Sequence, residues 1–190
     1  MSASTLQPHK PMGAFQSKRP SSVIDACDTF DQLPSEPLHD GTAFDFASTR
    51  GGVVLVVNVA SYCGLTTKNY EDFKLLQDRF GDDLTILAFP CNGFMFQEPF
   101  GAKSACAFAR KRGFKGMVFQ KVKVNGSGAS ETFKWLKSRA GVRRIEWNFG
   151  KFLIDRDGKV RGYYSPQTRP RVFEGDVEAL IGEKASEALA

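Results

Sequence analysis

Several features that assign a chain to a familiar class are absent from these 190 residues. No stretch approaches 18 consecutive apolar residues, which excludes a transmembrane helix. The chain has only two histidines and no C-x-x-C pair among its four cysteines, so we expect no zinc or other metal site, and we expect no bound cofactor. The start of the sequence has no apolar signal-peptide segment, which argues against a disulfide framework and favours a reducing compartment, the cytoplasm first.

Charges of the two signs are segregated along the chain. Residues 20–49 contain six acids and no Lys or Arg, whereas residues 101–144 contain twelve Lys or Arg and one acid, Glu131. Two interpretations stay open: a surface that steers an anionic partner, and a solvated basic face without a specific partner. No zinc-finger, RNA-recognition or helix-turn-helix pattern accompanies the charge, so we do not expect nucleic-acid binding.

The composition is that of one globular domain, which we expect over residues 23–190. Residues 1–22 combine prolines, Ser and Thr with basic residues and no acid, and we expect a tail there. Its basic character also fits an address to a mitochondrion or plastid, which stays an alternative to the cytoplasm. The segment 23–46 carries Pro34, Pro37 and Gly41 and fits a short β-hairpin, in which Cys27 has no signature.

The centre of the chain predicts a βαβ unit. The run 53–57 is apolar and rich in valine, which is typical of a strand buried on both faces, and we expect this strand over 53–59. A helix with Thr66 or Thr67 as its N-cap should follow as far as Phe80, because apolar side chains recur there at helical spacing. Residues 84–89 form a second apolar strand, parallel to the first. The loops that follow the two strands should therefore be neighbours and hold the ligand site.

The rest of the chain completes an α/β pattern, a mixed sheet flanked by helices. We expect helices over 102–112, 130–137 and 174–189, with Ser130 as the N-cap of the second. Residues 118–124 read as a strand and residues 139–144 as a basic loop. An Asp157-Gly158 turn joins strands 149–155 and 159–164 in a β-hairpin.

Cys63 stands where the first buried strand passes into a helix. Backbone N–H groups and the positive end of the helix dipole favour a thiolate at such a place, so Cys63 is a candidate nucleophile. Amide and indole side chains can hold a thiolate by hydrogen bonds. Asn92 and Gln97 follow the second strand, and Trp147 and Asn148 precede the hairpin. Each of these residues alone also fits a passive role in the core or on a loop.

Three long motifs in this order resemble the glutathione peroxidase family over about residues 22–181. They are Asn-Val-Ala-Ser-x-Cys-Gly-x-Thr from residue 58, Phe-Pro-Cys-Asn-x-Phe-x-x-Gln-Glu-Pro from residue 89, and Trp-Asn-Phe-x-Lys-Phe-Leu-Ile-Asp from residue 147. The resemblance is to the cysteine-containing monomeric type that acts on phospholipid hydroperoxides with thioredoxin. It implies a thioredoxin-like fold with an added N-terminal hairpin. It also implies that Cys63 is the peroxidatic residue and that Gln97, Trp147 and Asn148 hold and activate it.

The reaction implied by the resemblance is the reduction of hydrogen peroxide and of organic or lipid hydroperoxides, a defence against oxidative stress. The Cys63 thiolate attacks the terminal oxygen of the hydroperoxide, water or an alcohol leaves, and a sulfenic acid remains. One thiol condenses with this sulfenic acid and a second regenerates the enzyme, supplied by a thioredoxin-like protein or by glutathione. Cys106 is a candidate resolving cysteine in the helix 102–112; Cys91, or no internal resolver, are the alternatives.

Three departures from the family pattern bear on substrate preference. Gly93, Phe100 and Tyr163 stand where the family commonly has glutamine, glycine and arginine. Only about ten residues separate Lys137 from Trp147, which resembles the monomeric members that accept bulky lipid hydroperoxides and implies a monomer. By this resemblance, the basic segment 101–144 is expected to approach phospholipid head groups or the acidic face of a reductant protein. Two other functions stay open: a redox relay that passes the oxidation of Cys63 to a partner protein, and a basic binding module on a thioredoxin scaffold.

Overall fold

The computed structural model describes residues 22–183. The expected tail lies outside the described residues, except for Ser22, as do residues 184–190. Among residues 22–183, no helix is both long enough and apolar enough to cross a membrane.

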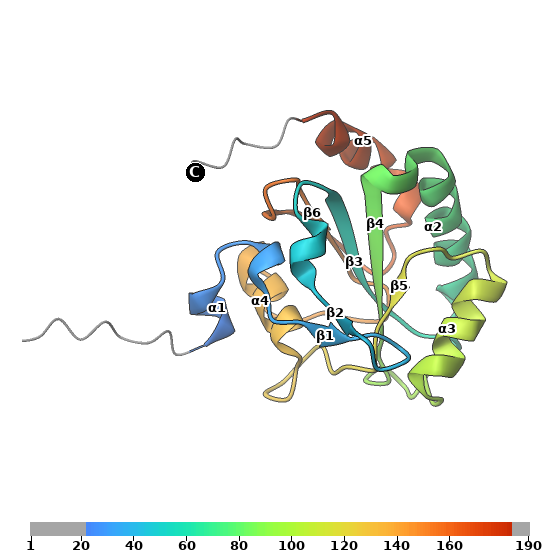
Figure 1. Cartoon of the computed structure of the whole chain (residues 1–190). Coiled ribbons are helices and arrows are strands. Elements are labelled where there is room, and N and C mark those ends of the chain that lie inside the picture. Colours follow the sequence, from blue (N-terminus) through green and yellow to red (C-terminus); the bar gives the residue numbers. More distant parts are fainter. Residues whose placement is uncertain (1–21, 184–190) are drawn as a thin grey trace, which may run out of the picture.

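A five-stranded mixed sheet, in the order β5-β4-β3-β6-β7, forms the centre of the molecule (Figure 1). Strands β3 (Val53–Val59) and β4 (Leu84–Pro90) pair in parallel, as the βαβ pattern predicts, and β5 (Met117–Val118) extends the parallel part. Strands β6 (Lys151–Ile154) and β7 (Val160–Tyr164) form the predicted hairpin and add antiparallel strands on the other side of β3.

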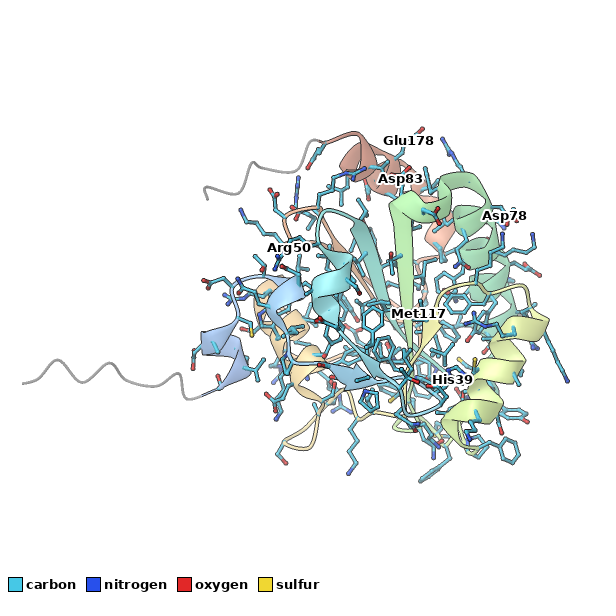
Figure 2. The ribbon with its side chains drawn as sticks, in the orientation of Figure 1. His39, Arg50, Asp78, Asp83, Met117 and Glu178 are labelled. Atoms are coloured by element: carbon cyan, nitrogen blue, oxygen red, sulfur yellow. The ribbon has the colours of Figure 1, made fainter. Side chains whose placement is uncertain are left out.

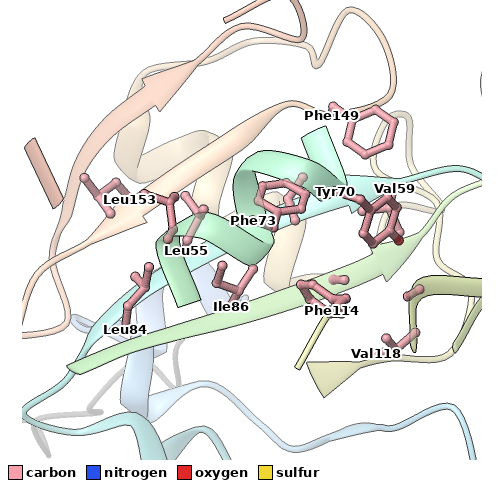
Figure 3. Packing of buried hydrophobic residues seen from close by; sticks show 14 of the residues in the cluster. Leu55, Val59, Tyr70, Phe73, Leu84, Ile86, Phe114, Val118, Phe149 and Leu153 are labelled. Atoms are coloured by element: carbon pink, nitrogen blue, oxygen red, sulfur yellow. The ribbon is translucent and has the colours of Figure 1, made fainter. Parts of the chain in front are cut away.

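Helices cover both faces of this sheet, which is why all seven residues of β3 are buried. Helices α2 (Thr66–Phe80), α3 (Ala102–Lys111) and α5 (Glu174–Gly182) pack on one face, where alternate β3 residues join Tyr70, Phe73 and Phe149 in a first cluster (Figure 3). Helix α4 (Glu131–Ala140) and the N-terminal segment pack on the other face, where Phe133, Trp135 and Phe152 belong to a second cluster.

Short elements precede the sheet. They are α1 (Val23–Ala26), the 3-10 turns η1 (Phe30–Gln32) and η2 (Phe46–Thr49), and the two-stranded hairpin β1 (Glu36–Pro37) with β2 (Ala43–Phe44). The N-terminal hairpin is therefore confirmed. The hairpin adjoins the β5 edge of the sheet, because His39 N–H donates to the C=O of Val118 over 2.8 Å. Figure 2 labels His39 in this hairpin and Met117 in β5. Two further 3-10 turns, η3 (Gly81–Asp83) and η4 (Pro170–Phe173), follow α2 and precede α5.

The predicted strand 118–124 is wrong beyond Phe119, which forms an isolated antiparallel bridge with Leu38. Gln120 N–H donates to the C=O of Pro37 over 2.9 Å, and Val122 N–H donates to the C=O of Pro90 over 3.0 Å. Neither proline has an N–H to donate in return, so the ladder of paired bonds that defines a strand stops.

Four predicted helix boundaries also need correction. Helix α3 ends at Lys111, one residue before the predicted end. Leu65, not a threonine, is the N-cap of α2, and no side chain caps it. Helix α4 is capped by Ser130 as predicted, but it includes Arg139 and ends at Ala140, where Gly141 adopts the left-handed conformation that ends many helices. Helix α5 ends at Gly182, because Glu183 is already extended, and the predicted helical residues beyond it lie outside the described residues.

Two buried charges fasten residues 165–171 to the sheet and to α2. Lys151 is fully buried, and its Nζ donates to the backbone carbonyls of Ser165, Pro166 and Thr168 over 3.3, 3.2 and 2.7 Å. Burial lowers the pKa of Lys151 to about 7, against the attraction of Asp72. Asp72 is also fully buried; burial acts to raise its pKa, but hydrogen bonds from Arg171 and Arg169 outweigh this and leave the pKa below its usual value.

Candidate active site

Cys63 lies in the turn 60–65, between the end of β3 and the start of α2. Thr66 N–H donates to the C=O of Cys63 over 3.0 Å, and the Thr66 hydroxyl donates to the C=O of Ala60 over 2.7 Å. These bonds close the turn at the first residue of the helix. The Cys63 side chain is 8% exposed, at the positive end of the α2 dipole.

The loop 91–99 after β4 lies directly against the Cys63 turn, as expected of loops that follow neighbouring parallel strands. Tyr62 N–H donates to the C=O of Gln97 over 3.0 Å. The N–H and the hydroxyl of Ser61 both donate to Glu98 Oε2 over 2.8 Å. The residues that precede Cys63 are therefore bound to the Gln97-Glu98 segment by three hydrogen bonds.

A third segment, residues 147–150, is held by Asn58 at the end of β3. The Asn58 side chain donates from Nδ2 to the C=O of Trp147 over 3.1 Å and accepts at Oδ1 from Gly150 N–H over 2.9 Å. The backbone C=O of Asn58 accepts from Phe149 N–H over 2.6 Å. Phe149 has a φ of 69°, a left-handed conformation that costs a residue with a side chain about 1–2 kcal/mol. The fully buried Asn58 thus holds a strained turn in place.

The predicted polar partners meet at this turn. Asn148 Nδ2 donates to Gln97 Oε1 over 3.0 Å, while the buried Asn148 Oδ1 has no hydrogen-bond partner among residues 22–183. The Trp147 ring packs on Phe94 at 5.6 Å between ring centroids and against the first cluster, which contains Cys63. Within the same residues the Cys63 sulfur makes no hydrogen bond to Gln97, Trp147 or Asn148, so the roles of these four residues stay predictions.

The four cysteines are all buried and free, but they lie on different faces of the sheet. Cys63 and Cys106 belong to the first cluster, on the side of α2 and α3. Cys91 and Cys27 belong to the second cluster. Burial raises the pKa of the Cys91 and Cys27 thiols, which disfavours the reactive thiolate at both positions.

Exposed apolar side chains lie on the Cys63 turn and on residues 95–100, which follow β4. They are 54–80% exposed and comprise Tyr62, Met95, Phe96 and Phe100, which we call the apolar rim. The Tyr62 and Phe100 rings meet at 6.0 Å between centroids. Met95 and Phe96 both have positive φ angles, 52° and 55°, so the loop is strained at two residues that it exposes.

Basic side chains line two hollows, of which the first includes residues of the loop 91–99. A hollow of about 350 Å³ is lined by Lys121 and Lys123 beside Asn92 and Gly93. A second hollow, of about 480 Å³, is lined by Arg143 and Arg144 beside Asn125 and Gly126.

Nowhere among residues 22–183 is a group of three or more His, Cys, Asp or Glu residues placed to hold a metal ion.

Two residues of this framework were missed by the motif reading. Asn58 and Glu98 stand inside the quoted motifs, but the sequence alone does not say which backbone groups they bind. A signal exists for Asn58, because it is the only polar residue in the otherwise apolar strand 53–59. A buried amide in such a run needs hydrogen-bond partners.

The fold places the protein in the thioredoxin-like class. A thiol:disulfide interchange protein of the thioredoxin family from Chlorobium tepidum superposes with a TM-score of 0.58 over 78% of this chain and 93% of that chain, at 18% identity. A crystal structure of Trgpx in apo form superposes with a TM-score of 0.69 at 32% identity, over 83% of this chain and 98% of that chain.

Residues 34–137 match the glutathione peroxidase family model. A probable phospholipid hydroperoxide glutathione peroxidase of Mesembryanthemum crystallinum is 47% identical over 75% of this chain and 86% of that protein. A mitochondrial glutathione peroxidase 1 of Chlamydomonas reinhardtii is 44% identical over 86% of this chain and 84% of that protein. The chain belongs to the glutathione peroxidase family, and it is a peroxidase, an oxidoreductase that reduces peroxide.

Proposed function

We propose that this protein reduces hydroperoxides through a sulfenic acid on Cys63, with Gln97, Trp147 and Asn148 as its polar partners. The observation that carries the proposal is the meeting of three segments at one place. The Asn148–Gln97 hydrogen bond and the Trp147 ring adjoin the turn that presents Cys63 at a helix N-terminus. The thiolate attacks the terminal peroxide oxygen, the O–O bond breaks, and the alkoxide takes a proton and leaves as alcohol.

We further propose that bulky apolar hydroperoxides are preferred, and that the protein touches a phospholipid surface while it acts on them. The apolar rim can accept acyl chains, and Lys121 and Lys123, which line a hollow with Asn92 and Gly93 of the same loop, can meet anionic head groups. The strained loop at Met95 and Phe96 supports this, because a conformation of this kind is retained where it serves a function. The Mesembryanthemum relative is named for phospholipid hydroperoxide.

Cys106 is the resolving cysteine in this proposal. It shares the first cluster with Cys63, whereas Cys91 belongs to the cluster on the opposite face. Cys106 is buried in α3, and in this proposal the helix opens locally so that the two sulfurs can bond. The thiol of Cys106 then condenses with the sulfenic acid to give a disulfide and water, and a thioredoxin-like protein reduces that disulfide. Direct reduction by glutathione is the alternative.

The domain boundaries, compartment and oligomeric state also belong to the proposal. We place a single catalytic domain over residues 23–190, working as a monomer, because the connection from Lys137 to Trp147 is short. The compartment is the cytoplasm or, given the basic residues 1–22 and the mitochondrial Chlamydomonas relative, an organelle.

Steady-state peroxide consumption, run in parallel with thioredoxin and with glutathione, tests this function. We expect turnover with thioredoxin that is lost in Cys63→Ser and in Cys106→Ser, and a Cys63–Cys106 disulfide after peroxide treatment. Full activity of Cys106→Ser would transfer the resolving step to an external thiol. Negligible turnover together with a trapped mixed disulfide to a partner protein would favour the redox relay instead.

A further inference from the structure

Glu98 is a buried acid that the proposed chemistry does not use. Its side chain is 1% exposed, and Oε2 accepts both hydrogen bonds that Ser61 donates. Its N–H donates to Asn92 Oδ1 over 3.0 Å, and its C=O accepts from Lys121 Nζ over 2.6 Å. One residue therefore joins the Cys63 turn, the start of the Gln97 loop and the segment after β5.

The second carboxyl oxygen of Glu98, Oε1, is buried and has no hydrogen-bond partner among the described residues. Such a group is costly, because burial removes its hydration without a replacement. Burial also raises the pKa of Glu98, and it outweighs the Ser61 hydrogen bonds and the Lys121 ammonium, which act to lower that pKa. Among residues 22–183, the phenol of Tyr70 is the only other titratable group shown to interact with Glu98. A carboxyl buried at this cost, and bound to the turn that carries Cys63, points to a role beyond stability.

The two halves of the Cys63 turn are fixed differently. The helix side is closed by Thr66, whose hydroxyl binds Ala60. The strand side has the bonds from Ser61 to Glu98 and from Tyr62 to Gln97. Because Ser61 precedes Cys63 by two residues, its position limits where the sulfur can lie relative to Gln97.

From these contacts we propose that Glu98 is a positioning residue, whose carboxyl group holds the Cys63 turn in register with the Gln97 loop. The inference rests on the proposed function, since it concerns how the peroxidatic thiol is held. What matters is the reach of the side chain to Ser61, not its charge. Glu98→Gln keeps the length and one acceptor oxygen, whereas Glu98→Asp keeps the charge but is one methylene too short to reach Ser61.

The chain offers a matched control in Glu36. Its carboxyl is also mostly buried, burial raises its pKa, and it accepts a hydrogen bond from the Thr132 hydroxyl. It lies in β1, away from the Cys63 turn. Glu36→Asp shortens a partly buried acid in the same way without touching the proposed site.

The experiment measures the rate of Cys63 oxidation by hydrogen peroxide in a single turnover, the pH profile of Cys63 alkylation by iodoacetamide, and the melting temperature. We expect Glu98→Asp to lower the oxidation rate about tenfold or more and to displace the pH profile, because a small misplacement of reacting atoms is expensive. Glu98→Gln should keep at least about a third of the wild-type oxidation rate. Ser61→Ala removes one of the two bonds to Glu98, so its oxidation rate should lie between those of Glu98→Asp and Glu98→Gln. Glu36→Asp should leave rate and profile unchanged.

The inference is overturned if Glu98→Asp reacts like the wild type, or if the Glu98 and Glu36 variants lose rate in parallel with melting temperature. Should Glu98→Asp fail to fold, Ser61→Ala decides, and an unchanged rate and pH profile in that variant would overturn the inference. Its failure is distinct from that of the proposed function. If Cys63→Ser still consumed peroxide, the proposed function itself would fail; if Cys63→Ser is inactive and the Glu98 variants are unaffected, only the role of Glu98 is lost.

Discussion

Replacing Asn58 by alanine removes the side chain that ties β3 to the Trp147-Asn148 turn. In the wild type that side chain serves two backbone groups, the C=O of Trp147 and the N–H of Gly150. Asn58 and Gly150 are buried, and alanine can replace neither hydrogen bond. The turn would keep only its backbone contacts to residue 58 while Phe149 remains in its left-handed conformation.

The expected cost follows from these two groups. A buried backbone group left without a partner costs about 1–3 kcal/mol, and Trp147 is only partly buried, so we expect Asn58→Ala to lower the free energy of unfolding by about 2–5 kcal/mol. This is a large share of the roughly 5–15 kcal/mol that stabilises a typical domain. Because the turn carries Trp147 and Asn148, we also expect the oxidation of Cys63 by peroxide to slow about tenfold or more in molecules that remain folded.

The assay is urea unfolding followed by circular dichroism, together with single-turnover oxidation of Cys63 at a temperature where the variant is folded. Asn125→Ala is the matched control, because Asn125 also bridges a backbone C=O and N–H, both of the buried Ile145, outside the turn 147–150. The same two-group reasoning predicts a comparable loss of free energy, about 2–5 kcal/mol, but an unchanged oxidation rate. If Asn58→Ala left the free energy of unfolding unchanged, or slowed the oxidation of Cys63 no more than Asn125→Ala does, the reasoning about the turn would be refuted.

Three further predictions concern neighbouring features. Tyr163 donates to Glu146, next to Trp147, over 2.6 Å, and we expect Tyr163→Phe to slow peroxide oxidation about threefold. Tyr164→Phe, which removes the equivalent 2.6 Å bond to Asp176, should not, and equal effects would contradict a role for Tyr163 in placing the turn. The pKa of Asp72 is lower in the folded state than in the unfolded chain, where it is about 4. Its contribution to stability is therefore present above about pH 4 and is lost as the pH falls through the folded-state pKa. The free energy of unfolding of Asp72→Asn should then fall less steeply below about pH 4 than that of the wild type, and parallel curves would contradict this. Replacing Phe96 by serine and Phe100 by glycine should lower the ratio of rates with a phospholipid hydroperoxide and with hydrogen peroxide about tenfold, and an unchanged ratio would exclude the apolar rim from lipid recognition.

The βαβ core was predictable because its signals are local. The valine-rich run 53–59 and the apolar run 84–89 are bounded by turns, and the helix between them shows its own periodicity. The strand predicted at 118–124 failed for a reason that is not local. It depends on Pro37 and Pro90, distant in sequence, which cannot return the hydrogen bonds that a ladder needs.

In the candidate site, the residues could be predicted from the sequence, but most of their contacts could not. Sequence motifs pointed to Cys63, Gln97, Trp147 and Asn148, and the order of the parallel strands predicted that two of the three loops are neighbours. That Asn148 donates to Gln97 depends on the strained turn at Phe149 and on Asn58, which no spacing rule describes. The separation of Cys106 from Cys91 depends on which face of the sheet each residue meets, which follows only from the packed structure.

The position of first oxidation tests the central claim most directly. The reduced protein is treated with one equivalent of hydrogen peroxide in the presence of a sulfenic-acid trap, and the peptides carrying its four cysteines are quantified by mass spectrometry. We predict that Cys63 carries the trapped adduct first, while Cys27, buried on the opposite face with a raised thiol pKa, stays largely unmodified. Oxidation of Cys27 ahead of Cys63 would contradict the assignment of Cys63 as the peroxidatic residue.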